Sequence, residues 1–184
     1  MKKNRWIIAA SITFTVISAA LGVRMRLQSK TAYAQPEEDG GVKDNTNLSA
    51  PKAISSREIT SFYTHFFCED PNDSSHTGAY RFQISKNDSG KFLLNAAGVI
   101  KGSIEAKVAL LESVQQIIER HELVKLNGIN CVTQGLPVQY SPCSLSAEYI
   151  SGEQLSFTTD GSPDFLWCLE LKNLFIDAIH KSGR

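Results

Sequence analysis

The longest hydrophobic stretch lies near the N-terminus, where the eighteen uncharged residues 6–23 follow Lys2, Lys3 and Arg5. A stretch of this length is at the short end of what can span a bilayer as a helix. Basic residues in front of it are typical of an export signal or of an anchor whose N-terminus is cytoplasmic. The pattern therefore predicts a short cytoplasmic segment at residues 1–5 and a transmembrane anchor or signal helix at residues 6–23.

The residues after this stretch leave two interpretations open. Arg24, Arg26 and Lys30 follow it closely, which favours a retained anchor because a signal peptide usually continues with small neutral residues. An Ala-Tyr-Ala sequence that ends at Ala34 is instead a pattern that a signal peptidase accepts. The first interpretation gives a single-pass protein of the cell membrane with its C-terminal domain outside. The alternative is a protein secreted after cleavage near Ala34.

A polar segment separates this stretch from the rest of the chain. Residues 35–53 are rich in Pro, Gly, Asn and acidic residues, and Val42 and Leu48 are their only larger aliphatic side chains. Such a composition buries too little apolar surface to fold. We therefore predict a disordered juxtamembrane linker at residues 24–53 and one extracytoplasmic domain at residues 54–184, which has the size of an ordinary single domain.

Alternation of apolar and polar residues predicts five strands in this domain. Residues 57–68 are dense in aromatic and β-branched side chains, and residues 80–85 alternate strictly between apolar and polar; both patterns are typical of strands. Turn-forming residues at 86–90 and at Gly152 indicate two hairpins. The predicted strands are residues 57–68, 80–85, 92–96, 144–149 and 154–158.

Helical spacing of apolar residues predicts two helices. Ser103 suits the N-cap of a helix that reaches about residue 123. Ser162, followed by Pro163, suits the start of a second helix that reaches about residue 180. Lys172 is expected on the solvent side of this second helix. Its expected buried face consists of Cys168, Leu171, Phe175 and Ile179. The intervening residues 127–142 hold two Pro and two Gly and are predicted as an irregular loop.

The order of these elements is β-β-β-α-β-β-α, with strands joined mainly by short turns. Short connections favour antiparallel pairing, and a sheet with one apolar face needs helices to cover that face. The predicted fold class is therefore α+β, a two-layer sandwich in which an antiparallel sheet of about five strands packs against two helices. Folds of this kind carry many activities, so the architecture alone assigns none.

Three strings of the domain support a family resemblance. They are IIERHELVKLNGI (residues 117–129), SLSAEYISGEQLSF (144–157) and SPDFLWCLELKNLFIDAI (162–179). With the order of elements, they resemble uncharacterised exported and lipoprotein-like domains of Gram-positive bacteria, over residues 59–179. The resemblance implies a bacterial exported protein and no assigned activity, so it transfers no catalytic residue. The chain departs from the lipoprotein members, because its first cysteine is Cys68 and no lipidation cysteine follows the apolar stretch.

Charge excludes two classes of partner. Residues 1–34 hold six Lys and Arg and no acidic residue, which leaves thirteen Lys and Arg against nineteen Asp and Glu in residues 35–184, a net charge of −6. Nucleic acids and anionic lipid surfaces are bound by clustered basic residues. We therefore predict no nucleic-acid partner and contact with the membrane only through the N-terminal helix. The remaining partner classes are an unknown protein, a peptide or a cell-envelope ligand.

The four cysteines allow three complete pairings in an oxidising compartment. Cys131 and Cys143 bracket one Pro- and Gly-containing loop, and we predict a disulfide between them. Cys168 lies on the apolar face of the last helix, where it is either an unreactive core thiol or a partner of Cys68. No C-x-x-C sequence is present, which argues against a thioredoxin-type role.

A polar cluster follows the first predicted strand. His65, Cys68 and His76 lie within twelve residues, with three acidic residues between them. These are the ligand and base types of a metal site or of a Cys/His nucleophile pair. Their spacing matches no standard motif closely, and turn formation alone explains the composition of residues 69–78. Both interpretations stay open.

Carboxylates around the last hairpin form a second candidate group. They are Glu148, Glu153, Asp160 and Asp164. Two of them have the chemistry of a glycosidase carboxylate pair, and acidic residues are equally expected in turns and at helix starts. His121 and His180 lie near the predicted C-termini of the two helices, where an imidazole favours the helix dipole.

Two classes of function follow from these patterns. The first is a membrane-tethered, non-catalytic binding module, which is favoured because no catalytic constellation is evident. The alternative is a small secreted or envelope enzyme, a hydrolase or a metal-dependent enzyme, that uses the His65–His76 region or the Glu148–Asp164 carboxylates. No catalytic residue, metal or cofactor is assigned in either case.

Overall fold

A computed structural model of the chain describes residues 41–70, 74–162 and 164–182. These residues belong to one compact unit, Asp39–Arg184. The predicted cytoplasmic segment at residues 1–5 and the predicted anchor at residues 6–23 lie outside the described residues. Within the described ranges, no helix is both long enough and apolar enough to span a bilayer.

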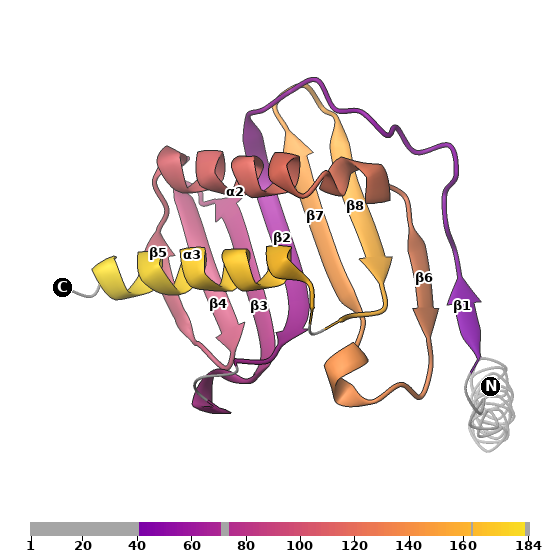
Figure 1. Cartoon of the computed structure of the whole chain (residues 1–184). Coiled ribbons are helices and arrows are strands. Elements are labelled where there is room, and N and C mark those ends of the chain that lie inside the picture. The colour runs from indigo at the N-terminus through magenta and orange to yellow at the C-terminus, as the bar shows by residue number, and fades with distance from the viewer. Residues whose placement is uncertain (1–40, 71–73, 163, 183–184) are drawn as a thin grey trace, which may run out of the picture. The chain divides into compact units, whose positions relative to one another are not determined.

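Eight strands form one open sheet (Figure 1). They are β1 (Val42–Asp44), β2 (Ile59–Cys68), β3 (Gly78–Lys86), β4 (Phe92–Gly98), β5 (Gly102–Glu105), β6 (Asn130–Thr133), β7 (Cys143–Tyr149) and β8 (Gln154–Thr159). The helices are α2 (Val108–Arg120) and α3 (Leu166–Ser182), with short 3₁₀ turns η1 (Ser74–His76), η2 (Leu123–Leu126) and η3 (Val138–Tyr140).

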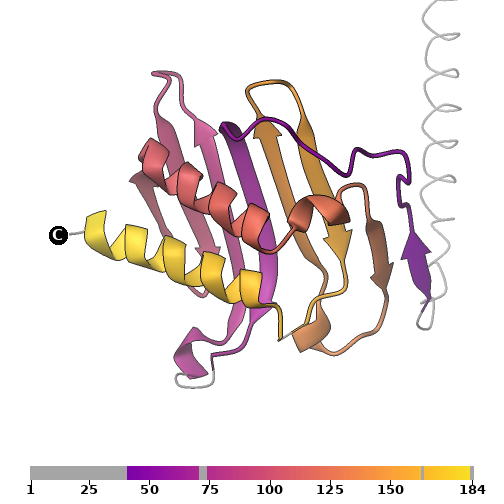
Figure 2. The same ribbon diagram turned by 45° about the horizontal axis from the view of Figure 1, so that its top comes forward.

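The strand order is β1-β6-β8-β7-β2-β3-β4-β5. All neighbours are antiparallel except β6 and β8, which are parallel. Helices α2 and α3 both lie on one face of the sheet, and no described segment covers the other face (Figures 1 and 2). The predicted α+β class, with two helices packed on one sheet, is confirmed. The predicted sheet of about five antiparallel strands is wrong, because the sheet has eight strands and one parallel pair.

The core lies between this sheet and the two helices. Strand β2 alternates as predicted, with Phe62 and Phe66 buried and Tyr63 half-buried on the opposite face. From α3, the ring of Phe175 lies 4.5 Å from that of Phe82 and 5.9 Å from that of Phe62, measured between ring centroids. Other core residues from the sheet are Tyr80, Ile84, Leu94, Leu145, Leu155 and Phe157. The predicted inward face of the last helix is confirmed for Cys168, Leu171 and Phe175, while Ile179 is only partly buried.

Two of the unpredicted strands are short. Ser103 is not an N-cap, because it lies in β5 opposite Asn95, and α2 begins five residues later at Val108. The predicted loop at 127–142 contains β6, which is four residues long. In stretches this short, alternation cannot be told from helical or irregular spacing, so pairing with β4 and β8 decides the conformation.

The start of the last helix also differs from its prediction. The backbone N–H groups of Asp164 and Phe165 donate to Ser162 Oγ and Ser162 O, at 3.3 Å and 3.2 Å. Ser162 therefore closes a turn ahead of the helix, and α3 begins at Leu166.

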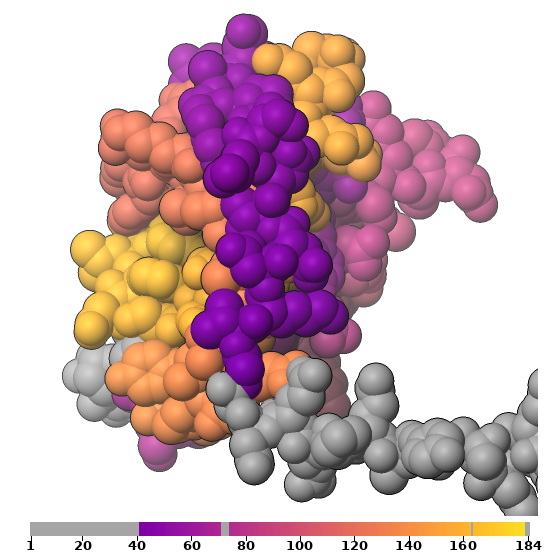
Figure 3. Space-filling view, turned by 90° about the vertical axis from the view of Figure 1, so that its right-hand side faces the viewer, coloured from indigo at the N-terminus to yellow at the C-terminus, as the bar shows by residue number. Residues whose placement is uncertain are grey.

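A third unpredicted strand lies in the expected linker. Residues 41–54, here called the N-terminal arm, run along the edge of the sheet (Figure 3), and β1 pairs with β6 over Val42–Asp44. The backbone N–H of Asn47 donates to Gly128 O at 2.8 Å. The prediction of a disordered segment is therefore wrong for residues 41–53. Backbone hydrogen bonds hold this segment, and its polar composition gave no sign of them.

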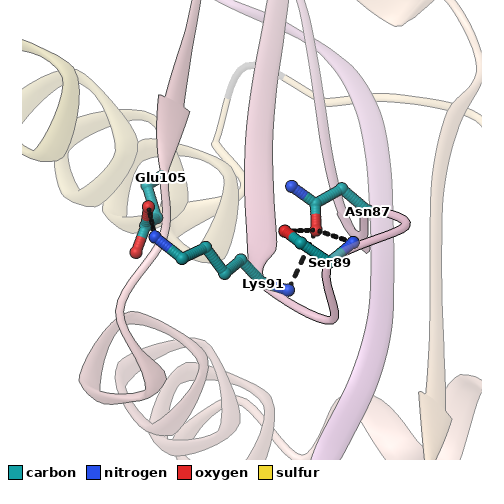
Figure 4. A network of polar contacts seen from close by, with 4 residues as sticks. All are labelled: Asn87, Ser89, Lys91 and Glu105. Atoms are coloured by element: carbon teal, nitrogen blue, oxygen red, sulfur yellow. Dashed lines mark hydrogen bonds and ion pairs between the residues drawn. The ribbon is translucent and has the colours of Figure 1, made fainter.

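The β3–β4 hairpin turns where the sequence predicted. Asn87 Oδ1 accepts hydrogen bonds from the backbone N–H groups of Ser89 and Lys91, both at 3.0 Å, and from Ser89 Oγ at 2.7 Å. Lys91 Nζ lies 2.8 Å from Glu105 Oε2 and so connects the turn to β5 (Figure 4). One asparagine side chain therefore replaces the backbone partners that the turn residues lack.

Candidate functional site on the open face of the sheet

The strand register places six uncharged polar side chains in one row across six strands. Each member is the cross-strand partner of the next. In order they are Ser156, Ser146, Tyr63, Gln83, Asn95 and Ser103. We call this set the polar row. With about 4.8 Å between neighbouring strands, it spans about 24 Å.

The polar row lies on the face away from the helices. Its members alternate along their strands with buried residues such as Phe62, Phe82 and Leu145, and successive side chains of a strand point to opposite faces. Gln83, Asn95, Ser103 and Ser156 are exposed, while Tyr63 and Ser146 are half-buried. The row is therefore accessible to a ligand along its whole length.

Charged residues flank the polar row on both sides. Arg81 and His65 form one cross-strand pair beside it, and Glu148 pairs with Ser61 on the other side. Burial, followed by the positive charge of Arg81, lowers the pKa of His65, while a hydrogen bond to the carbonyl of Pro142 acts in the opposite direction. The members of the row are Ser, Tyr, Gln and Asn, which are uncharged at neutral pH, and Arg81 and Glu148 lie on opposite sides of the row.

A cavity of about 560 Å³ lies at the β8 end of the polar row. Gln154, Ser156 and Thr158 of β8 contribute to its wall together with Phe157, whose side chain faces the core, so the cavity lies at the free edge of β8. Amides and hydroxyls from the arm and from the segment after η2 supply much of the remaining wall. They are Asn45, Asn47, Ser49, Asn127 and Asn130. Ser156 belongs to both features, so the cavity adjoins the β8 end of the polar row.

Asn127 holds the wall of this cavity in place. Its Oδ1 accepts from the backbone N–H of Ser156 at 2.8 Å, and its Nδ2 donates to Gln154 O at 3.0 Å and to Pro51 O at 2.9 Å. Its own carbonyl accepts from Lys52 Nζ. The Asn127 side chain therefore hydrogen-bonds backbone groups at the edge of β8, as a neighbouring strand would. Its bond to Pro51 O attaches the arm to the same edge.

The structure separates the predicted His/Cys cluster. His65 lies on the open face of β2, while Cys68, three residues on, is 4% exposed and faces the core. His76 lies in η1, where its carbonyl accepts from the Tyr80 hydroxyl at 2.6 Å. A nucleophile pair of His65 and Cys68 is therefore contradicted. Among the described residues, no group of three His, Cys, Asp or Glu side chains is placed to hold a metal ion.

Two of the four predicted carboxylates connect parts of the fold. Glu153 accepts from the backbone N–H groups of Ser55 and Ser56 at 2.9 Å and 3.0 Å, and these bonds, with the Ser151 hydroxyl, lower its pKa. Asp160 accepts from the N–H and the hydroxyl of Thr133 at 2.7 Å and 2.8 Å. Glu148 is exposed on the open face, and Asp164 is exposed ahead of α3. Turn and loop anchoring therefore accounts for Glu153 and Asp160.

The predicted Cys131–Cys143 disulfide is contradicted by the strand order. Thr159 of β8 pairs with Cys131 on one side and with Cys143 on the other. Two strand spacings separate the cysteine Cα atoms by about 10 Å, whereas a disulfide needs them within about 7 Å. All four cysteines are free thiols.

Three of the thiols are buried in the core: Cys68, Cys143 and Cys168. Burial raises the pKa of Cys143 to about 12. Burial also raises the pKa of Cys168, and the neighbouring Cys143 and Cys68 add to this effect. These cysteines are therefore protonated core residues at neutral pH, because only the thiolate is a nucleophile.

Lys172 was predicted on the solvent side of the last helix, and this prediction is wrong because its side chain is buried. It is 1% exposed, and its Nζ lies 2.9 Å from Asp70 Oδ2. The long side chain starts on α3 next to buried Leu171 and reaches the loop after β2. The sequence does place a lysine beside the apolar stripe of the last helix and an acidic loop after the first strand. Only the packing of α3 on the sheet, however, brings Lys172 next to Asp70.

Comparison with known proteins adds no family assignment. The chain matches no protein-family model, no curated protein and no solved structure. The resemblance to exported and lipoprotein-like domains of Gram-positive bacteria therefore stays a prediction.

Proposed function

We propose that this protein is a membrane-tethered, non-catalytic binding module that takes its ligand on the open face of the sheet, outside the cell membrane. The observation that carries the proposal is the polar row, which runs across six strands on a face that no described segment covers. Helices on one side alone leave this face to solvent or to a partner. The adjoining cavity supplies a concave site of the size that small ligands occupy.

The chemistry of the face favours binding over catalysis. Serine, glutamine and asparagine side chains donate and accept hydrogen bonds but are poor acids and bases at neutral pH. The enzyme alternative uses either the His65–His76 region or the Glu148–Asp164 carboxylates. In the first region His65 and Cys68 lie on opposite faces of β2, and in the second Glu153 and Asp160 hold loop residues by hydrogen bonds. The predicted anchor at residues 6–23 and the predicted exported location make an envelope component the natural partner.

The proposal is tested with the whole 184-residue chain in mild detergent and with delipidated Gram-positive cell envelopes. We expect the protein to co-sediment with the envelopes in a saturable manner. Ser146→Arg places a long charged side chain in the middle of the polar row and should abolish co-sedimentation. Glu112→Arg changes the charge of an exposed residue on α2 and should leave it unchanged.

Equal binding by the two variants would contradict the proposal, as would the absence of binding by the unmodified protein. Thermal unfolding of both variants shows whether they remain folded.

A further inference from the structure

We infer that the ligand of the open face is a neutral glycan, which lies along the polar row and places one end in the cavity beside the N-terminal arm. The inference rests on the proposed binding function and adds the chemical class of the ligand. Three observations carry it: the hydrogen-bonding groups of the row, the charges beside it and the lining of the cavity.

The side chains of the polar row match sugar hydroxyls. Hydroxyls and primary amides both donate and accept hydrogen bonds, as each hydroxyl of a sugar does. Tyr63 lies in the middle of the row between Ser146 and Gln83, and it adds an amphipathic ring, apolar in its body and polar at its tip. An extended polyhydroxylated chain therefore finds partners on six strands and a ring against which to pack.

The charges beside the row give a charged polymer no net attraction. Arg81 and Glu148 lie on opposite sides of it, and Glu105 is paired with Lys91. An extended polyanion or polycation on the row would meet one like and one opposite charge, so attraction and repulsion oppose each other. A neutral chain needs no charged partner, and the row offers it uncharged hydrogen-bonding groups.

A peptide ligand would use different features of a sheet. Peptides that join a sheet pair with a free strand at its edge. The edge strands here are β1 and β5, which are only three and four residues long. Five of the six strands that carry the polar row, β8, β7, β2, β3 and β4, already have a neighbouring strand on each side, and only β5 is an edge strand.

The cavity gives the row a distinct end. Its volume of about 560 Å³ falls in the range of small-molecule sites. Its wall combines the β8 side chains that include Ser156 with the arm residues Asn45 and Asn47. The arm therefore closes one end of the site, and an end sugar held there would be recognised by amides and hydroxyls.

The inference is tested by calorimetric titration of the whole chain, in mild detergent, with cellohexaose, maltohexaose, chitohexaose and dextran, and with heparin and polylysine as charged comparisons. We expect saturable binding of at least one neutral glycan that persists in about 0.5 M NaCl, where exposed charges are largely screened. Tyr63→Ala should weaken this binding at least ten-fold, the size of loss typical of a binding hot spot.

The double variant Gln83→Ala/Asn95→Ala removes two exposed members of the row. It replaces Tyr63→Ala as the test variant if Tyr63→Ala unfolds the protein. It should also weaken binding at least about ten-fold. Gln116→Ala, an exposed amide on α2, should have no effect. Binding of heparin or polylysine alone would overturn the inference, as would glycan binding that the row variants do not weaken.

Envelope treatments separate failure of the inference from failure of the proposed function. Periodate, which cleaves vicinal diols of sugars, should abolish co-sedimentation, and protease treatment of the envelopes should not. If protease abolishes it and periodate does not, the open face binds a protein and the glycan inference is overturned while the binding function stands. If light scattering shows a dimer that Ser146→Arg dissociates, a second copy of the chain occupies the face and the glycan inference is also overturned.

Discussion

Lys172 Nζ lies 2.9 Å from Asp70 Oδ2, with the lysine side chain 2% exposed and the aspartate side chain 19% exposed. The pair joins the middle of α3 to the loop after β2, two segments about one hundred residues apart in the chain. A buried ammonium group is costly unless a partner neutralises it. The contact therefore connects α3 to Asp70, two residues after the end of β2.

We predict that Lys172→Ala lowers the free energy of unfolding by about 3 kcal/mol, since removal of one member of a buried pair leaves the other without its partner. Urea unfolding measures the change. Lys181→Ala is the control, because Lys181 is 80% exposed and lies 4.0 Å from Asp177, and it should cost no more than about 0.5 kcal/mol. In Lys172→Met/Asp70→Asn, part of the loss should be recovered. Equal effects of the two single substitutions would show that the buried pair does not stabilise α3.

The second prediction concerns two glycines with the same backbone conformation. Gly128 and Gly152 have φ angles of 82° and 83°, so alanine strains either position by about 1 kcal/mol. An added Cβ at Gly128 would lie 2.4 Å from both Asn47 O and Ala50 Cβ. An added Cβ at Gly152 would have no such atom within 4 Å. Gly128→Ala should therefore cost at least about 1 kcal/mol more than Gly152→Ala in thermal unfolding, because the arm must also move.

Release of the arm has a readout of its own. Lys52 lies in the arm and donates to the carbonyl of Asn127, so limited trypsin digestion should cut after Lys52 faster in Gly128→Ala than in Gly152→Ala. Identical digestion rates would mean that the arm is not held against Gly128.

Alkylation distinguishes the four cysteines. Cys131 is half-buried, while Cys68, Cys143 and Cys168 are at most 4% exposed. The pKa of all four thiols is raised, with burial as the main cause, so access to the reagent distinguishes them. Iodoacetamide under native conditions should modify Cys131 alone among them, and the other three should react only after unfolding. Mass spectrometry of non-reduced peptides gives the result directly. A Cys131–Cys143 disulfide in these peptides would contradict the sheet order.

The fourth prediction is a pH dependence of stability from His65, whose pKa is lowered from 6.5 by burial and by Arg81. Below pH 6.5 the unfolded chain binds a proton that the folded chain does not, so the stabilisation is present above this pH and is lost as the pH falls through the folded-state pKa. The free energy of unfolding should therefore fall more between about pH 7 and pH 5 in the unmodified protein than in His65→Gln. An NMR titration that gives His65 a pKa above 6.5 would contradict this account.

The sequence predicted the elements whose apolar pattern is long. Strand β2, the β3–β4 and β7–β8 hairpins and the inward face of α3 follow from alternation, turn residues and helical spacing. Strands β1, β5 and β6 are three or four residues long, and in such short stretches pairing partners decide the conformation. Lys172 shows the same limit for side chains, because its burial depends on where Asp70 lies.

The candidate site depends still more on tertiary structure. The alternation of apolar and polar residues can assign Tyr63, Gln83 and Asn95 to the solvent face, each within its own strand. It does not show that the three residues are cross-strand neighbours. Register and strand order bring them into one row. The cavity depends on the arm, which the sequence predicted as disordered.

The central claim is that ligand binds the open face of the sheet, and carbene footprinting of the whole chain with and without delipidated envelopes tests it most directly. We predict reduced labelling of peptides that hold Tyr63, Gln83 and Asn95 when envelopes are present, with unchanged labelling of the exposed residues of α2 such as Glu112 and Gln116. Protection confined to α2 and α3, with the strand peptides labelled equally in both conditions, would contradict the claim.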